Sequence, residues 1–242
     1  MELITTIFNE FLYRPLFNIL IFFYNIIPWH DFGLAIILIT LLIRIILFPL
    51  SKKGLKSRKA LEEIQPKIKE VQKKYKDKEE RARQMMLLYK EHKVNPVSGC
   101  LPLLIQLPIL IALYRALMGI LENSGNLSAI LYSFVKDPGL INTSFFGAIN
   151  LAAPSLFLAI LTGIFQFIQS KMMFKPSAKA KAPGQKMDIQ KTMGRQMTYF
   201  MPLFIVFISL KLPAGLPLYW AASTLFGIGE HLLINRETTK AT

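Results

Sequence analysis

Cysteine, histidine and acidic residues are scarce in this sequence, which has one cysteine, three histidines and 15 Asp or Glu residues among 242. The single cysteine, Cys100, excludes an intrachain disulfide and a cysteine-based metal cluster. The apolar segments also lack a His-Glu metal motif, a Gly-rich phosphate loop, a Ser/Lys pair and paired aspartates. We therefore expect no metal, no cofactor and no enzymatic reaction.

Basic and hydrophobic residues are abundant instead. The 29 Lys and Arg residues give a net charge of +14, yet 52% of the residues are hydrophobic and the mean hydropathy is +0.39. A single soluble core has no reason to combine these properties, so the charged and the apolar residues must be segregated along the chain. Five apolar runs, each near or below the roughly 20 residues that a spanning helix needs, lie at 32–50, 99–121, 151–170, 197–212 and 215–234. They predict an all-α polytopic membrane protein with five transmembrane helices.

The predicted organisation has ten segments. In chain order they are an N-terminal interfacial amphipathic helix (1–30), a first transmembrane helix (31–51), a cytoplasmic coiled-coil hairpin (52–97), a second transmembrane helix (98–122), an extracytoplasmic loop (123–150), a third transmembrane helix (151–171), a cytoplasmic loop (172–196), a fourth and a fifth transmembrane helix (197–212 and 215–234) and a cytoplasmic tail (235–242).

The distribution of Lys and Arg predicts how these helices are oriented. Segment 51–98 holds 15 Lys or Arg against 7 Asp or Glu, and segment 171–198 holds 7 against 1, whereas segment 122–150 has Lys136 as its only base. The two basic segments and the tail are therefore predicted to face the cytoplasm. Anionic lipid headgroups are the expected partner of this charge, and ribosomal RNA is the competing one.

Residues 4–28 are apolar enough to resemble a further span, but four polar residues interrupt them. At 100° per residue, Glu10, Arg14, Asn18 and Asn25 fall within about 80° of one another. A polar stripe of this kind favours a helix that lies in the membrane interface. If the segment spans instead, the N-terminus moves to the cytoplasmic side and the later helices keep their orientation.

The charged segment 52–93 carries an apolar repeat. A 3-4-3-4 spacing, typical of one arm of a coiled coil, is found at Leu61, Ile64, Ile68, Val71 and Tyr75. The polar stretch 76–80 is predicted to make a turn, after which a second arm carries Ala82, Met85 and Tyr89. Pro66 should kink or interrupt the first arm. The hairpin could simply connect two spans. A two-residue turn would be enough for that, however, so the length of the hairpin favours a function of its own.

Arg44 lies in the first apolar run, where Thr40 is its only polar company. A guanidinium keeps its proton, and placing it at mid-membrane costs from about 2.5 to well over 10 kcal/mol, so it needs water or a partner. Thr40 and Arg44 are i and i+4 on one helix face, which a single water-filled groove could serve. Alternatively Arg44 snorkels to the interface, because Leu50 is only six residues, roughly 9 Å, away.

Other polar residues occur within the predicted spans. They include Gln106, Thr162, Gln166, Gln169, Ser209, Ser223 and Thr224. The simplest role for any one of them is a hydrogen bond between helices.

Three stretches are distinctive as sequence motifs. They are QPKIKEVQKKYK (65–76), MMLLYKEHKVNPVSGCLPLLIQLPILIALY (85–114) and LPAGLPLYWAASTLF (212–226). Together with the run around Arg44, they resemble the YidC/Oxa/Alb family of membrane protein insertases, over about residues 4 to 235. The chain resembles bacterial members without a large extracytoplasmic domain, and its tail after Ile234 is eight residues instead of a long basic ribosome-binding tail.

The resemblance implies a five-helix core around a hydrophilic groove that is open to the cytoplasm and the lipid but closed outside. Arg44 takes the place of the family's groove arginine, Thr40 and Trp220 match polar and aromatic groove positions, and Gln166 is a weaker match. Gln106 is a further candidate for the lining. The implied activity is to insert and help fold membrane proteins, alone or with the Sec translocon.

The resemblance also implies where the protein acts and with what. The expected location is the bacterial plasma (inner) membrane, with several spans and a cytoplasmic C-terminus. Newly made membrane proteins and lipids are the expected partners, the Sec translocon, the ribosome and the signal recognition particle receptor are candidates, and DNA is not expected. The hairpin would receive these partners, and its candidate contact residues are Lys67, Lys69, Lys73, Lys74, Met85 and Met86.

A small transporter or channel whose Arg44 binds an anionic solute is the alternative function. Broken helices in two related halves would favour it, and the sequence has no visible internal repeat.

Overall fold

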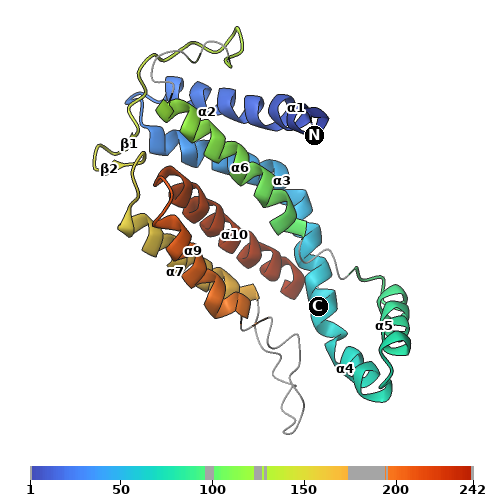
Figure 1. Cartoon of the computed structure of the whole chain (residues 1–242). Coiled ribbons are helices and arrows are strands. Elements are labelled where there is room, and N and C mark those ends of the chain that lie inside the picture. Colours follow the sequence, from blue (N-terminus) through green and yellow to red (C-terminus); the bar gives the residue numbers. More distant parts are fainter. Residues whose placement is uncertain are drawn as a thin grey trace. The chain divides into compact units, whose positions relative to one another are not determined.

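The computed structural model describes residues 2–95, 101–122, 127, 130–173, 194 and 196–240. Most of the predicted cytoplasmic loop 172–196 lies outside these residues. The chain forms two compact units, of which the first comprises Met1–Ile46 and Leu107–Gly229 and the second comprises Leu47–Gln106 and Glu230–Thr242. Nearly every described element is a helix (Figure 1).

The N-terminal segment is one continuous helix. It begins as α1 (Glu2–Phe8), passes through a π-helical turn, η1 (Asn9–Tyr13), and continues as α2 (Arg14–Ile26). The predicted polar stripe is used within the protein. Asn18 is buried and bonds to residues 130 and 132, and Asn25 donates to the carbonyl of Lys136. The stripe therefore holds the loop that precedes the β-hairpin.

Helix α3 (Phe32–Glu63) starts at Asp31, whose carboxylate accepts from the backbone N–H of Leu34 at 2.8 Å and so caps the helix. It runs on for 32 residues with Pro49 inside it. The apolar run therefore gives way to charged sequence without a break in the helical backbone as far as Glu63, where the helix ends within the predicted first arm of the hairpin.

The second unit contains the helical hairpin. Helix α4 (Gln65–Lys74) begins next to Pro66, so this proline opens a helix at a position that needs no N–H donor. The turn is shorter than predicted, because α5 (Lys78–Glu91) starts immediately after Asp77, whose side chain accepts from the N–H of Glu80. The hairpin has its own small core of Ile64, Ile68, Leu88 and Val94, packed against Ala60, Leu61, Val71, Met85 and Tyr89.

Three helices of the described part are long and apolar enough to cross a membrane by length and composition. They are α3, the segment Leu104–Leu121 of α6 (Leu101–Glu122), and α7 (Leu156–Met173). The fourth expected span is a shorter apolar stretch, made of the π-helix η3 (Gln196–Phe200) and α9 (Met201–Ser209). The fifth is α10 (Gly215–Lys240). The number of five spans thus stays a prediction.

Helices α7 and α9 and residues 215–229 of α10 belong to the first unit (Figure 1). Gly163 of α7 is buried against α9, and a Cβ there would overlap the side chain of Val206. The hydroxyl of Thr162 donates to the carbonyl of Pro217 at the start of α10 at 2.9 Å. These contacts place one face of α10 beside α7.

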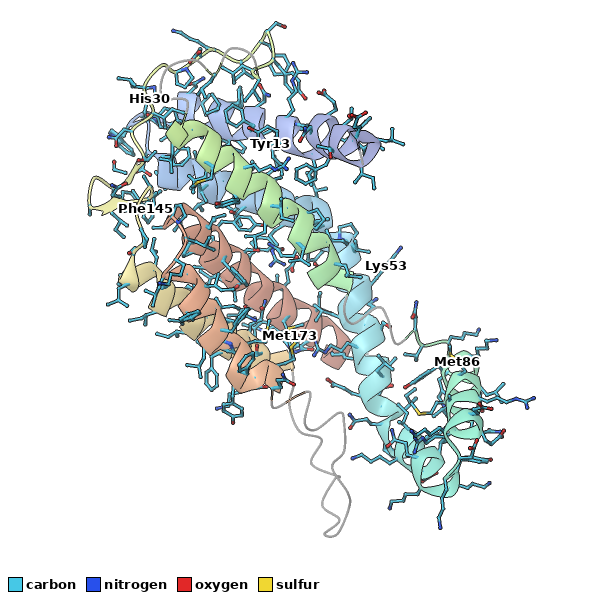
Figure 2. All side chains as sticks on the ribbon, in the orientation of Figure 1. Tyr13, His30, Lys53, Met86, Phe145 and Met173 are labelled. Atoms are coloured by element: carbon cyan, nitrogen blue, oxygen red, sulfur yellow. The ribbon has the colours of Figure 1, made fainter. Side chains whose placement is uncertain are left out.

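A short β-hairpin interrupts the loop 123–150. Strands β1 (Ser144–Phe145) and β2 (Ile149–Asn150) are antiparallel, and the turn between them has positive φ at Phe146 (48°) and Gly147 (66°). Two positive φ angles are typical of a type I′ turn. The ring of Phe145, labelled in Figure 2, packs on Gly33 of α3 so closely that a Cβ there would overlap it.

Candidate functional site

Arg44 of α3 is held by Ser223 of α10. The Nε and Nη2 atoms of Arg44 both donate to the hydroxyl oxygen of Ser223, at 2.9 and 2.7 Å. Ser223 is buried, at 2% exposure, whereas Arg44 is half-buried. Because a hydroxyl is neutral, this contact orients the guanidinium without neutralising its charge.

Two further residues lie at the same place. A Cβ on Gly227, one turn after Ser223, would overlap the amide nitrogen of Gln169 and would lie 3.6 Å from Nη1 of Arg44. Gln169 also donates to the carbonyl of Thr224 at 3.5 Å, so α7 reaches α10 here. We call Arg44, Gln169, Ser223, Thr224 and Gly227 the Arg44 cluster. It joins α3, α7 and α10.

The predicted neighbours of Arg44, Thr40 and Gln166, both make hydrogen bonds within their own helices. Thr40 is fully buried and donates to the carbonyl of Ile36 in its own helix at 2.6 Å. Gln166 is half-buried and donates to Ser170, also in its own helix, at 3.4 Å. Gln169, three residues further along α7, makes the contact with α10. Gln166 was predicted as the groove residue of this helix, and Gln169 is the glutamine that the structure brings to Arg44.

Trp220 and Gln106 are both partly exposed. Trp220 precedes Ser223, Thr224 and Gly227 by three, four and seven residues on α10, so helical periodicity places it on the same face as the Arg44 cluster. Gln106 is the last residue of the second unit before α6 enters the first.

A second arginine, Arg115 of α6, also lies in an apolar helix and was not predicted as a functional residue. Its Nη1 atom donates to the side-chain oxygen of Asn9 at 3.1 Å, and its guanidinium lies 5.2 Å from the ring centroid of Phe8. Tyr13, labelled in Figure 2, approaches the same helix, with its hydroxyl 3.3 Å from where a Cβ on Gly119 would lie. Arg115 thus joins the N-terminal helix to α6. Its position inside the apolar run 99–121 is the sequence feature from which it could have been predicted.

The candidate contact residues of the hairpin fall into two groups. Lys67 pairs with His92 across the hairpin (Nζ to Nε2, 2.8 Å), Lys73 and Lys74 are exposed, and Lys69 is half-buried. Met85 packs on the hairpin core, whereas Met86, labelled in Figure 2, is 60% exposed.

Met85 and Met86 line an open pocket of about 560 Å³ with Lys78, Arg81, Ala82, Arg83 and Tyr89.

Tyr89 lies between this pocket and the hairpin core. Burial raises the pKa of its hydroxyl above the usual value of 10.0. Leu88 next to it is buried in the core although no position was predicted there, and Ala82, predicted as a core position, is exposed.

A family model shows to which proteins the chain is related. The model of the family described as 60Kd inner membrane protein matches residues 22–241. The chain belongs to this family. The matched residues include the whole Arg44 cluster and the hairpin.

Members of the family with similar sequences are named membrane protein insertase YidC. The insertase of Oceanobacillus iheyensis is 38% identical over 213 residues, which are 86% of this chain and 75% of that protein. The one from Clostridium tetani is 36% identical, with 86% and 84% covered. The one from Wolinella succinogenes is 37% identical over 95% of this chain, but the match spans only 38% of its own length.

A solved structure of this insertase family has the same fold. It is described as an active YidC insertase crystal structure with the first transmembrane domain resolved, and it is 30% identical to this chain with a TM-score of 0.53. The match covers 80% of this chain and 40% of that one. The predicted family is therefore confirmed.

Proposed function

We propose that this chain, a bacterial inner-membrane insertase by family, inserts membrane proteins by drawing acidic or polar segments of its substrate toward Arg44. The observation that carries the proposal is the contact between Arg44 and Ser223, in which a buried neutral hydroxyl holds a permanent positive charge of an apolar helix. Newly made membrane proteins are the substrates, and no enzymatic step is needed.

The physical task of an insertase is to lower the cost of moving polar groups through hydrocarbon. Each charged side chain at the membrane centre costs several kcal/mol, so a hydrophilic groove that holds water and Arg44 shortens the path. Half-exposed Arg44, partly exposed Trp220 and the polar side chains beside them would line that groove, and the exposed apolar faces of α7 and α9 would guide the hydrophobic segment into lipid. The transfer of that hydrophobic segment from water into lipid supplies the free energy for insertion.

The proposed topology has five spans, with the hairpin, the loop 172–196 and the C-terminus in the cytoplasm. The excess of Lys and Arg in 51–98 and 171–198 supports this orientation. The stretch Gln196–Ser209 holds only 14 residues, about 21 Å at helical rise. A span of that length favours local thinning of the bilayer, which would lower the barrier for the substrate.

The hairpin is proposed to meet substrates and delivery factors before insertion. Exposed Met86 and Leu87 offer adaptable apolar contacts between basic residues of α5. A hydrophobic segment with acidic flanks matches this surface. The ribosome, the signal recognition particle receptor and the Sec translocon are candidate partners at this side of the membrane.

The experiment that tests the proposed function is insertion by purified variants of the full chain. The chain is reconstituted in vesicles of phosphatidylethanolamine and phosphatidylglycerol, and the substrate is a small single-span protein with one aspartate in the tail that crosses. Arg44→Lys should retain much of the initial insertion rate, measured by protease protection of the tail. Arg44→Ala should lose about ten-fold or more, because an attraction of at least 1.4 kcal/mol is removed.

Arg115→Ala is the matched control. It removes the same charge from another apolar helix, at a site that joins α6 to the N-terminal helix and lies outside the Arg44 cluster. Its insertion rate should stay within about two-fold of the unmodified chain. If Arg44→Ala inserts this substrate as fast as the unmodified chain, the proposed role of Arg44 is wrong.

A further inference from the structure

Two large apolar side chains are exposed at the end of the first unit where α3 begins. Trp29, shortly before α3, is 80% exposed, and Phe146, at the tip of the β-hairpin, is 68% exposed. We propose that these two side chains form an anchor that enters the lipid headgroup layer on the side of the membrane where α3 begins. In the proposed topology this is the extracytoplasmic side.

Asp31 holds the two positions of this anchor together. One oxygen of its buried carboxylate accepts from a backbone N–H in the first turn of α3, and the other accepts from the N–H of Phe146. The neighbouring ring of Phe145 packs on Gly33, also in the first turn of α3. Trp29 lies only two residues before Asp31. The tip of the β-hairpin is therefore fixed beside the start of α3, where a spanning helix leaves the hydrocarbon.

The backbone of Phe146 shows that this residue does not serve the turn. Its φ of 48° lies in the left-handed region, which bulky side chains rarely adopt. The first central position of a type I′ turn favours Asn, Asp or Gly, so asparagine would suit the turn better than phenylalanine. The ring of Phe146 contacts that of Phe145, with centroids 4.6 Å apart, but most of its surface is exposed. An unfavourable residue kept at an exposed tip points to a role outside the protein.

The corner that carries Trp29 is built in the same way. His30 has a φ of 49°, and its ring lies 5.5 Å from that of buried Tyr24, between centroids. The hydroxyl of Tyr24 accepts from the N–H of Asn142, in the segment that leads to β1. Tyr24 and Asp31 thus each join this corner to the β-hairpin or to the segment before it, so the exposed Trp29 is displayed from a fixed backbone.

Lipid is the occupant that the surroundings of the β-hairpin favour. Helix α7, which is long and apolar enough to span a membrane, begins shortly after β2 and exposes Leu156 and Phe157 in its first turn. The N–H of Gly215, at the start of α10, donates to the carbonyl of Leu151, which directly follows β2. The β-hairpin therefore lies beside the starts of α3, α7 and α10 (Figure 1). Aromatic residues gather at this level of membrane proteins, because one side of the interface is apolar and the other is wet.

Tryptophan fluorescence of the full chain in vesicles of phosphatidylethanolamine and phosphatidylglycerol tests the anchor. The chain has two tryptophans, so Trp220→Phe leaves Trp29 as the only fluorophore of this kind. Trp29→Phe, Trp220→Phe and Phe146→Trp together report position 146. Asp137→Trp in the same background is the reference, because Asp137 is an exposed charged residue of the loop before β1. Each chain is quenched by phospholipids with a nitroxide near the headgroup and, separately, by iodide in water.

The expected result is that the lipid nitroxide quenches positions 29 and 146 at least about three-fold more strongly than position 137, with the reverse order for iodide. If iodide quenches positions 29 and 146 as strongly as position 137, this surface faces water and the inference is wrong. If lipid quenches only one of the two positions, they do not form one anchor, and the inference is wrong as well.

Phe146→Asn separates an anchor from a packing residue. Asparagine suits the turn, so this variant should unfold in detergent at the same or a higher temperature than the unmodified chain. In the Trp220→Phe background it should still reduce the quenching of Trp29 by lipid to about half or less, because the anchor loses one of its two side chains. Phe134→Asn makes the same change at an equally exposed phenylalanine on the loop held by α2, and should leave the quenching of Trp29 unchanged.

Two outcomes of this comparison would overturn the inference. A lower unfolding temperature for Phe146→Asn would show that the ring of Phe146 stabilises the fold by packing. Unchanged quenching of Trp29 in Phe146→Asn would show that the two side chains act separately. Neither measurement involves Arg44 or an inserted substrate, so the anchor and the proposed function can fail independently.

Discussion

Asn18 illustrates how one buried side chain can fix a distant loop. Its amide nitrogen donates to the carbonyls of Arg14 (2.8 Å) and Ile130 (3.1 Å), and its oxygen accepts from the N–H of Tyr132 at 2.7 Å. Arg14 adds a bond from Nε to the same carbonyl of Ile130 at 3.2 Å and lies 5.0 Å from the ring centroid of Tyr132. All the hydrogen-bonding groups of the Asn18 amide are therefore used inside the protein.

Asn18→Ala should destabilise the docked loop more than Asn25→Ala does. The first change leaves the N–H of Tyr132 without its partner and removes one of the two side-chain donors to the carbonyl of Ile130, at a cost of about 1–3 kcal/mol. Asn25 is only half-buried and makes one bond, to the carbonyl of Lys136, which water can replace. Amide hydrogen exchange at Tyr132 should accelerate at least five-fold in Asn18→Ala and less than two-fold in Asn25→Ala. Equal acceleration in both would show that the loop is held elsewhere.

At the scale of elements, the hairpin shows what a local pattern can and cannot predict. Leu61, Ile64, Ile68 and Val71 were predicted from a 3-4 spacing and do pack in its core, because the repeat is long enough to define one helix face. The second arm is short, so its face was ambiguous. Ala82 was predicted as a core residue but is exposed, and Leu88, which was not predicted, is buried in the core.

The Arg44 cluster shows the same limit across helices. Gln166 and Gln169 lie three residues apart on α7, so periodicity alone puts both near one face. Only the packing of α7 on α10 decides that Gln169 reaches Thr224. Ser223 was visible as a polar residue in a span, but its role depends on α3, 179 residues away in sequence. Arg44 itself was predictable because an arginine between apolar residues is costly anywhere.

The hairpin should respond to alkaline pH through Tyr89. Its folded pKa is raised by burial above the unfolded value near 10.0, so the folded state favours the neutral phenol. The stabilisation from this group is fully present below the unfolded pKa and is lost as the pH rises through the folded pKa. Comparing tyrosinate absorbance of the unmodified chain with that of Tyr89→Phe isolates its titration. The difference signal should have its midpoint above pH 10 in the native chain.

Leu88→Ala provides the control for this titration. It removes a buried neighbour from the hairpin core and should open the packing around Tyr89. The midpoint of the difference signal should then move down toward 10. A midpoint at or below 10 in the native chain would show that Tyr89 is exposed in solution.

At the scale of the whole molecule, the segregation of charge along the chain favours one orientation. The apolar helices carry few charges, whereas the segments 51–98 and 171–198 carry most of the bases. A cytoplasmic hairpin also suits the role proposed for it, because newly made proteins reach the membrane from the cytoplasm. The orientation can be tested independently of any insertion assay.

Single cysteines placed in a chain carrying Cys100→Ser should report this orientation in intact bacterial cells. Cysteine at Lys136, in the loop held by Asn25, should react with a membrane-impermeant maleimide without permeabilisation. Cysteine at Lys76, in the turn of the hairpin, should react only after the membrane is opened, because Lys and Arg flanks favour the cytoplasm. Lys76 is exposed on the protein, so slow labelling there would reflect the membrane and not burial. Rapid labelling of position 76 in sealed cells would reverse the orientation and, with it, the side from which substrates reach Arg44.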